Sequence, residues 1–207
     1  MRAGSVCGSK EEPIISAIAG RFVGFNKRRL VPIVNTSRSA ELASRFASAR
    51  TKYRPVHTKV LFVAEAPPAF GSERFFYFED VRRFDALFWD SMRVLYRVTE
   101  VERSRKVEFL NRFKEGGFFL IDACSLPLSK SAGKKREIRN SLEDLKIRLS
   151  DRVEADTKIV LICKTVYDVC FKVLRGAGFN VINTEPIPHP AFGHAAEFRK
   201  NLGRLLS

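Results

Sequence analysis

The chain has 207 residues, of which 45% are hydrophobic and 29% charged, a composition that is typical of a folded globular protein and excludes general disorder. No apolar run reaches the roughly 20 residues of a membrane-spanning helix, and no signal peptide is recognisable, so we expect an intracellular protein without a membrane partner. The net charge of +14 favours a polyanion as partner, of which nucleic acid is the commonest inside cells. A basic but merely solvated surface is the alternative explanation.

The first 57 residues carry two helical patterns. One begins close to Pro13, a residue that favours the first turn of a helix, and extends over residues 11–25. The second covers 37–50, with alanine, leucine and phenylalanine on one face and arginine outside. We therefore expect residues 1–57 to form a helical extension that packs on the core of a main domain, residues 58–207.

Four short apolar runs follow, each bounded by turn residues, over 59–66, 117–124, 158–164 and 179–184. They are continuous rather than alternating, which is typical of parallel strands that are buried on both faces. Helical patterns separate or follow them, over 80–98, 141–153, 165–178 and 196–206. This alternation predicts the α/β class, as a three-layer α/β/α sandwich around a central four-stranded parallel sheet.

The helix expected over 141–153 has a start signal of its own. Ser141 precedes Asp144 by three residues, which predicts a capping box with aspartate in place of the usual glutamate.

The four cysteines lack the short spacings of zinc and iron–sulfur sites. Cys124 and Cys163 lie in apolar runs, where a free cysteine behaves as a small hydrophobic residue. We therefore expect reduced structural cysteines, no metal and no cofactor.

Polar residues follow three of the predicted strands, where open α/β sheets bind their ligands. Glu65 ends the first run in the sequence AEAPP, Asp122 ends the second, and His189 follows the fourth in HPAFGH. An aromatic run, FFYF at 75–78, comes shortly after the first strand.

These segments resemble the motifs of the uracil-DNA glycosylase superfamily. In the thermostable classes of that superfamily the first motif is Gly-Glu-Ala-Pro-Gly, the last is His-Pro-Ser, and a phenylalanine between them stacks on the flipped base. The resemblance covers residues from about 58 to 207 and implies hydrolysis of the N-glycosidic bond of a deaminated or damaged base in DNA. Glu65 would position the water, His189 would support the leaving base, and Phe76, or Phe78 next to it, would stack on the base.

The sequence departs from the family pattern around the pocket. Ala66 stands where the strongest uracil-excising class has a catalytic aspartate, and with Pro67 it would line the substrate site. Asp122 occupies the place of an asparagine that reads uracil; an ionised carboxylate only accepts hydrogen bonds, so another base would be preferred. The structural alternatives are that Asp122 caps a loop, that Glu65 caps a helix or pairs with an arginine, and that His189 is an ordinary loop histidine.

A basic loop follows the second strand and resembles that of a crosslinking branch of the superfamily. The branch ends this loop in a histidine that attacks the sugar; no histidine stands there in this sequence, so no covalent trapping is expected. The loop would hold the DNA backbone, with a solvated charge run as the alternative. The expected DNA-contacting residues are Lys130, Lys134, Lys135, Arg136, Arg139 and, in the last motif, His194.

The resulting hypothesis is a monomeric DNA glycosylase that binds single- or double-stranded DNA. One alternative is a non-catalytic nucleic-acid-binding relative that kept the fold and lost the chemistry. The other is a small-molecule hydrolase, because an α/β fold does not fix function.

Overall fold

The computed structural model describes residues 34–69, 74–80, 84–100, 102–129 and 133–207, and Val34–Ser207 form one compact unit. The helix expected over 11–25 and the side chain of Lys130 lie outside the described residues. Because the helix that begins at Val34 belongs to the same compact unit as the sheet, that unit starts well before the expected boundary at residue 58.

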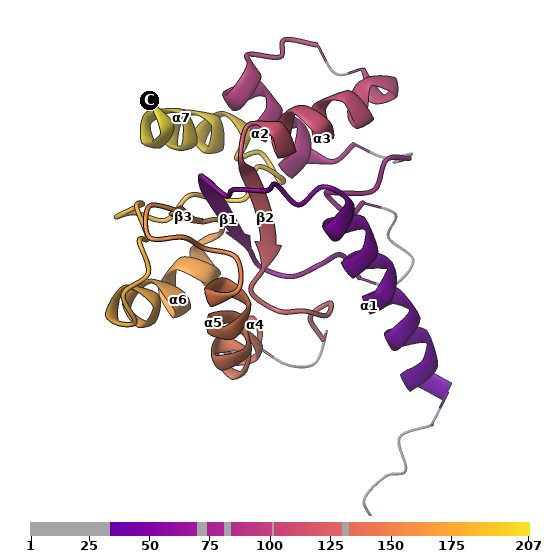
Figure 1. Cartoon of the computed structure of the whole chain (residues 1–207), viewed down its shortest axis with the longest axis vertical. Helices are drawn as coiled ribbons and strands as arrows, with labels where there is room; N and C mark the ends of the chain where they lie inside the picture. The colour runs from indigo at the N-terminus through magenta and orange to yellow at the C-terminus, as the bar shows by residue number, and fades with distance from the viewer. Residues whose placement is uncertain (1–33, 70–73, 81–83, 101, 130–132) are drawn as a thin grey trace, which may run out of the picture. The chain divides into compact units, whose positions relative to one another are not determined.

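The described residues alternate strands and helices (Figure 1). In chain order the elements are α1 (Val34–Lys52), β1 (Val60–Ala64), α2 (Ala86–Tyr96), the 3₁₀ helix η1 (Arg103–Arg105), α3 (Lys106–Glu115), β2 (Phe118–Asp122), α4 (Lys134–Asn140), α5 (Leu142–Ser150), β3 (Lys158–Leu161), α6 (Lys164–Gly176) and α7 (Ala195–Leu206).

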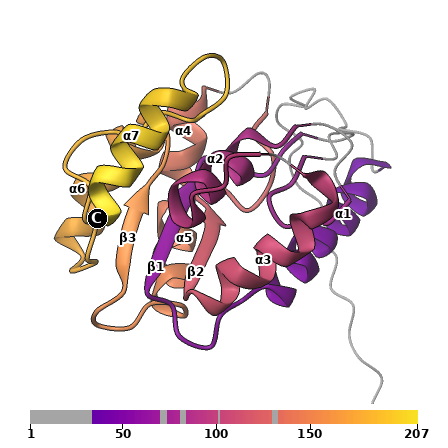
Figure 2. The same cartoon turned by 90° about the horizontal axis from the view of Figure 1, so that it is seen from above.

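The sheet has three parallel strands in the order β2-β1-β3. All five residues of the central strand β1 are buried, as its unbroken apolar run predicts. Helices α2, α3 and α7 cover one face of the sheet, and α4, α5 and α6 cover the other (Figures 1 and 2). The predicted α/β class is therefore confirmed.

The fourth predicted strand, over 179–184, is not a strand of this sheet. Val181 forms an isolated parallel bridge to Ile159 of β3, and Ile187 forms one to Ile162, directly after β3. Between them the side chain of Asn183 replaces a neighbouring backbone: its Oδ1 accepts from the Leu161 N–H at 2.9 Å and its Nδ2 donates to the Leu161 carbonyl at 3.3 Å. A side-chain amide carries the same donor and acceptor as a peptide group, so Asn183 satisfies Leu161, while the N–H and carbonyl of Ile159 bond the backbone of Asn180 and Ile182.

The aromatic run covers the other edge of the sheet. Phe75, Phe76 and Tyr77 are each at most 4% exposed. The hydroxyl of Tyr77 donates to the Leu120 carbonyl and accepts from the Leu120 N–H, on the free side of β2. This segment is therefore part of the core and protects an edge strand.

Three helical features of the structure differ from what the sequence predicted. The helix α3 was not predicted at all. The basic segment expected as a loop forms the short helix α4 from Lys134 onward. Ser141 does not cap α5: its hydroxyl donates to the Glu137 carbonyl at 3.1 Å, and α5 has no side-chain cap.

Candidate functional site

The ends of the three strands meet at one edge of the sheet. Backbone hydrogen bonds continue past the strands, from Ala123 N–H to the Ala64 carbonyl at 2.7 Å and from Cys124 N–H to the Glu65 carbonyl at 3.2 Å. The Cys163 N–H donates to the Ile187 carbonyl at 2.8 Å, which ties the segment that leads to His189 to the end of β3. The topology thus gathers the predicted site segments, as parallel strands require.

Glu65 directly follows the central strand and places its carboxylate at this edge of the sheet. Its Oε2 lies 2.8 Å from the Nζ of Lys134, the first residue of α4. The Glu65 side chain is 20% exposed and that of Lys134 is 63% exposed. The hydrogen bond to Glu65 raises the pKa of Lys134, which keeps this ammonium charged. The structure therefore joins a predicted catalytic residue to a predicted DNA-contacting one.

His189 is held as a neutral imidazole. Its Nδ1 accepts the backbone N–H of Ala191 at 3.2 Å, so that nitrogen is unprotonated and the ring proton is on Nε2. Burial lowers the pKa of His189; the negative charges of Asp85 and Glu65 oppose this shift, and the charge of Lys134 adds to it. The charges of Glu65 and Lys134 therefore both act on the imidazole, whose Nε2–H can serve as a donor.

The two candidate stacking residues have different surroundings. Phe76 is 4% exposed, and its ring packs against those of Tyr77, Phe88 and Phe113. It therefore presents no free face to a base. Phe78 is only half-buried, and the guanidinium of Arg45 lies 5.5 Å from the centre of its ring.

Asp122 does not present its carboxylate to a pocket. It is 4% exposed, and its Oδ2 lies 2.7 Å from a guanidinium nitrogen of Arg50 on α1. Burial raises the pKa of Asp122, while the charges of Arg50 and Arg148 oppose the shift. Arg148 also donates to the backbone carbonyls of Asp122 and Ala123. The side chain expected to read a base thus belongs to a buried ion pair.

Three further predicted residues directly follow Glu65 or Lys134 in the chain. Pro67 is buried and Ala66 half-buried, directly after Glu65. On α4, Lys135 pairs with Asp168 at 2.8 Å.

The other predicted cations lie at the surface. Arg136 and Arg139 are exposed. His194 is also exposed, directly before α7, with its Nδ1 3.5 Å from Glu197.

Two residues of this edge, Phe192 and Cys163, have a positive φ that side chains rarely adopt, and neither conformation was predicted from the sequence. Phe192 has φ 58° and is fully exposed, three positions after His189. Its position between Pro190 and Gly193 was the available signal, because proline and glycine mark a tight turn. Cys163 has φ 78°, directly before α6; burial raises its thiol pKa to about 12, so it is not a thiolate.

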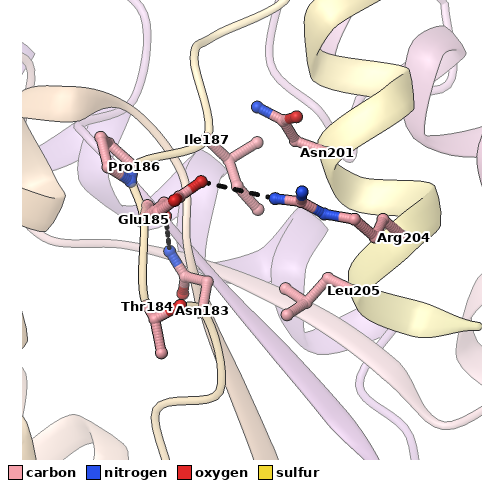
Figure 3. A pocket seen from close by; sticks show the side chains of 8 residues that line it. All are labelled: Asn183, Thr184, Glu185, Pro186, Ile187, Asn201, Arg204 and Leu205. Carbon is pink, nitrogen blue, oxygen red and sulfur yellow. Dashed lines mark hydrogen bonds and ion pairs between the residues drawn. The ribbon is translucent and has the colours of Figure 1, made fainter.

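A cavity of about 320 Å³ lies elsewhere, between the segment 183–187 and α7 (Figure 3). Glu185 and Arg204 approach to 3.4 Å across it, and the Asn183 amide is bonded to backbone carbonyls. Neither Glu65 nor His189 lines this cavity.

The part of the chain that the structure describes holds no cluster of histidine, cysteine, aspartate and glutamate suited to a metal ion. Within the same residues, no helix combines the length and the apolar character that crossing a membrane requires.

Comparisons of the chain with protein-family models, curated proteins and solved structures found no match. The likeness to the glycosylases is therefore a resemblance of motifs.

Proposed function

We propose that this protein is a DNA glycosylase that hydrolyses the N-glycosidic bond of a deaminated or damaged base flipped out of DNA. The proposal rests on two chemical groups, a carboxylate and a neutral imidazole, that follow strands ending at the same edge of the sheet. Glu65 provides a carboxylate at the end of the central strand, and the segment that leads to His189, a neutral imidazole with an available Nε2–H, is bonded to the end of the neighbouring strand β3.

These two groups suit the two halves of the reaction. The bond between the sugar C1′ and the base nitrogen breaks as water adds to C1′, and the sugar passes through a positively charged, oxocarbenium-like state. The Glu65 carboxylate would stabilise that charge and accept a hydrogen bond from the water. The His189 Nε2–H would donate to the base oxygen on which negative charge develops.

The surroundings support a nucleic-acid substrate inside the cell. The net charge is +14, and α4 carries Lys134, Lys135, Arg136 and Arg139 beside the site. Phe192 is a fully exposed ring on the loop that follows His189. Apolar side chains of this kind are inserted between base steps by proteins that distort DNA. We therefore assign Phe192 as the residue that fills the gap left by the flipped base.

A second candidate, a non-catalytic nucleic-acid-binding protein, is favoured by two observations. Phe76 lies within the core, and Asp122 is bound to Arg50, so neither residue is free to recognise a base. Phe78 is then the candidate ring for stacking, because it reaches the surface.

The deciding experiment is an abasic-site cleavage assay on uracil, hypoxanthine, xanthine and alkylated-base oligonucleotides, single- and double-stranded. We expect strand breaks after alkaline treatment with one of these bases, and none with Glu65→Gln or His189→Ala. Lys172→Gln, on the exposed surface of α6, is the matched control and should behave as the wild type. DNA affinity without product would support the binding protein, and affinity that does not depend on salt would exclude both DNA functions.

A further inference from the structure

The ion pair between Lys134 and Glu65 joins a surface cation to the carboxylate of the candidate site. The Lys134 Nζ lies 2.8 Å from the Glu65 Oε2, and the Lys134 side chain is 63% exposed against 20% for Glu65. The ammonium therefore faces the solvent, while the carboxylate lies deeper at the end of β1. A group that arrives from solution meets Lys134 before it meets Glu65.

Lys134 can leave this ion pair for another acceptor at little cost. Ion pairs with this exposure contribute little to stability, because water screens them and the long side chains lose freedom. A lysine ammonium is a point charge with three rotatable donors, so it can turn to another acceptor without the fixed geometry that an arginine requires. A phosphate carries a full negative charge and competes with a single carboxylate for such a donor.

The neighbouring charges favour a phosphate at this position. Arg136 and Arg139 lie on the same short helix and are exposed, and no side-chain partner for either is found among the described residues. Lys135 and Lys164 share a single carboxylate, that of Asp168. The surface beside Lys134 therefore carries unbalanced positive charge, to which the DNA backbone is attracted.

We infer that Lys134 exchanges partners when DNA binds: it neutralises Glu65 in the free protein, and it binds a backbone phosphate in the complex. The exchange releases the Glu65 carboxylate to hold the attacking water, so the charge needed for hydrolysis becomes available only when substrate is present. Lys134 is thus a positioning residue that couples phosphate binding to the site. This inference rests on the proposed function.

A double-mutant cycle on DNA affinity tests the exchange without any need for catalysis. The probe is a duplex oligonucleotide of undamaged bases. Glu65→Gln frees Lys134 from its partner and should tighten binding by about 2- to 5-fold, which is the range for an exposed ion pair. Lys134→Met should weaken binding and reduce the slope of log affinity against log salt by about 1. In the Lys134→Met background, Glu65→Gln should then change the DNA affinity no more than the control substitution Glu108→Gln does.

The control is Glu108→Gln, which removes the same charge from an exposed pair with Arg105 on η1 and α3. A Glu65→Gln gain that persists unchanged with Lys134→Met would mean general charge repulsion and would overturn the exchange. Lys134→Gln repeats the test with a polar side chain, and circular dichroism verifies that each variant is folded.

The kinetics of base excision provide an independent test of the exchange. If the protein excises a base, Lys134→Met should raise KM and leave kcat unchanged, because Glu65 is then permanently free; a fall in kcat alone would contradict the exchange. Coupling in the DNA-binding cycle without any abasic product would leave the exchange standing and refute the glycosylase function. Absence of salt-dependent DNA binding would overturn both.

Discussion

The hydroxyl of Tyr77 makes two hydrogen bonds to one residue of the edge strand β2: it donates to the Leu120 carbonyl at 3.0 Å and accepts from the Leu120 N–H at 2.7 Å. The whole arrangement is buried, with Tyr77 only 1% exposed. Asn183 does the same for Leu161 at the opposite edge. At Leu120 and at Leu161 a side chain therefore takes the place of a neighbouring strand, and the backbone groups of these two residues are not free to pair with another chain.

Tyr77→Phe should lower the free energy of unfolding by about 2–4 kcal/mol, because the N–H and carbonyl of Leu120 are then left buried without partners. Urea denaturation measures this change. Tyr53→Phe is the control, since its hydroxyl bonds the exposed Glu79 and its loss should cost less than about 1 kcal/mol. An equal loss of unfolding free energy in the two variants would mean that the two hydrogen bonds to Leu120 stabilise the protein no more than an exposed one does.

Asp122→Asn should destabilise the protein and leave the choice of base unchanged. The carboxylate is bound to Arg50, so its removal leaves a largely buried guanidinium without a counter-charge, at a cost of about 1–3 kcal/mol. Asp151→Asn, at a carboxylate that is 64% exposed, should cost less than about 0.5 kcal/mol. A changed order of preference on a panel of modified-base oligonucleotides would show instead that Asp122 reads the base.

His189 should remain neutral below the pH at which an ordinary histidine is protonated. Burial lowers its pKa from 6.5, so below pH 6.5 the unfolded chain binds a proton that the folded chain does not. The free energy of unfolding should therefore fall as the pH falls from 6.5 toward the lower pKa of the folded state, while the folded protein keeps a neutral His189 over that range.

NMR titration of the imidazole resonances measures the His189 pKa directly. The imidazole resonances of the urea-unfolded chain provide the reference. His189→Gln should remove its part of the pH dependence of stability. A His189 pKa at or above the ordinary value of 6.5 would contradict the expected direction.

Phe192→Ala should reduce excision from double-stranded DNA about 10-fold and affect single strands little, because only a duplex leaves a gap when a base is flipped out. Its ring is fully exposed, so stability should not fall, and relief of the positive φ is largest in Phe192→Gly. Single-turnover rates on matched single- and double-stranded substrates make the comparison. The same loss on both would assign Phe192 to another role.

Much of the fold follows from patterns local in the chain. The apolar runs at 59–66, 117–124 and 158–164 contain β1, β2 and β3, because burial on both faces demands continuous hydrophobicity. The same locality places Glu65 at the end of β1. The run at 179–184 does pair with β3, through backbone hydrogen bonds of Asn180 and Ile182 to Ile159, but the pairing stops there, because the side chain of Asn183 takes the place of backbone at Leu161, 22 residues away.

The sequence by itself determined the α/β class, the basic character and the position of Glu65 at a strand end. Only the tertiary structure decided what the polar groups contact. Asp122 is bound to Arg50 from 72 residues away, and Glu65 to Lys134 from 69 residues away. Periodicity reports whether a residue is buried, because burial repeats along each element. The choice of partner depends on which distant segments meet. The aromatic run that resembled a base-stacking surface therefore covers an edge strand, whereas Phe192 lies fully exposed.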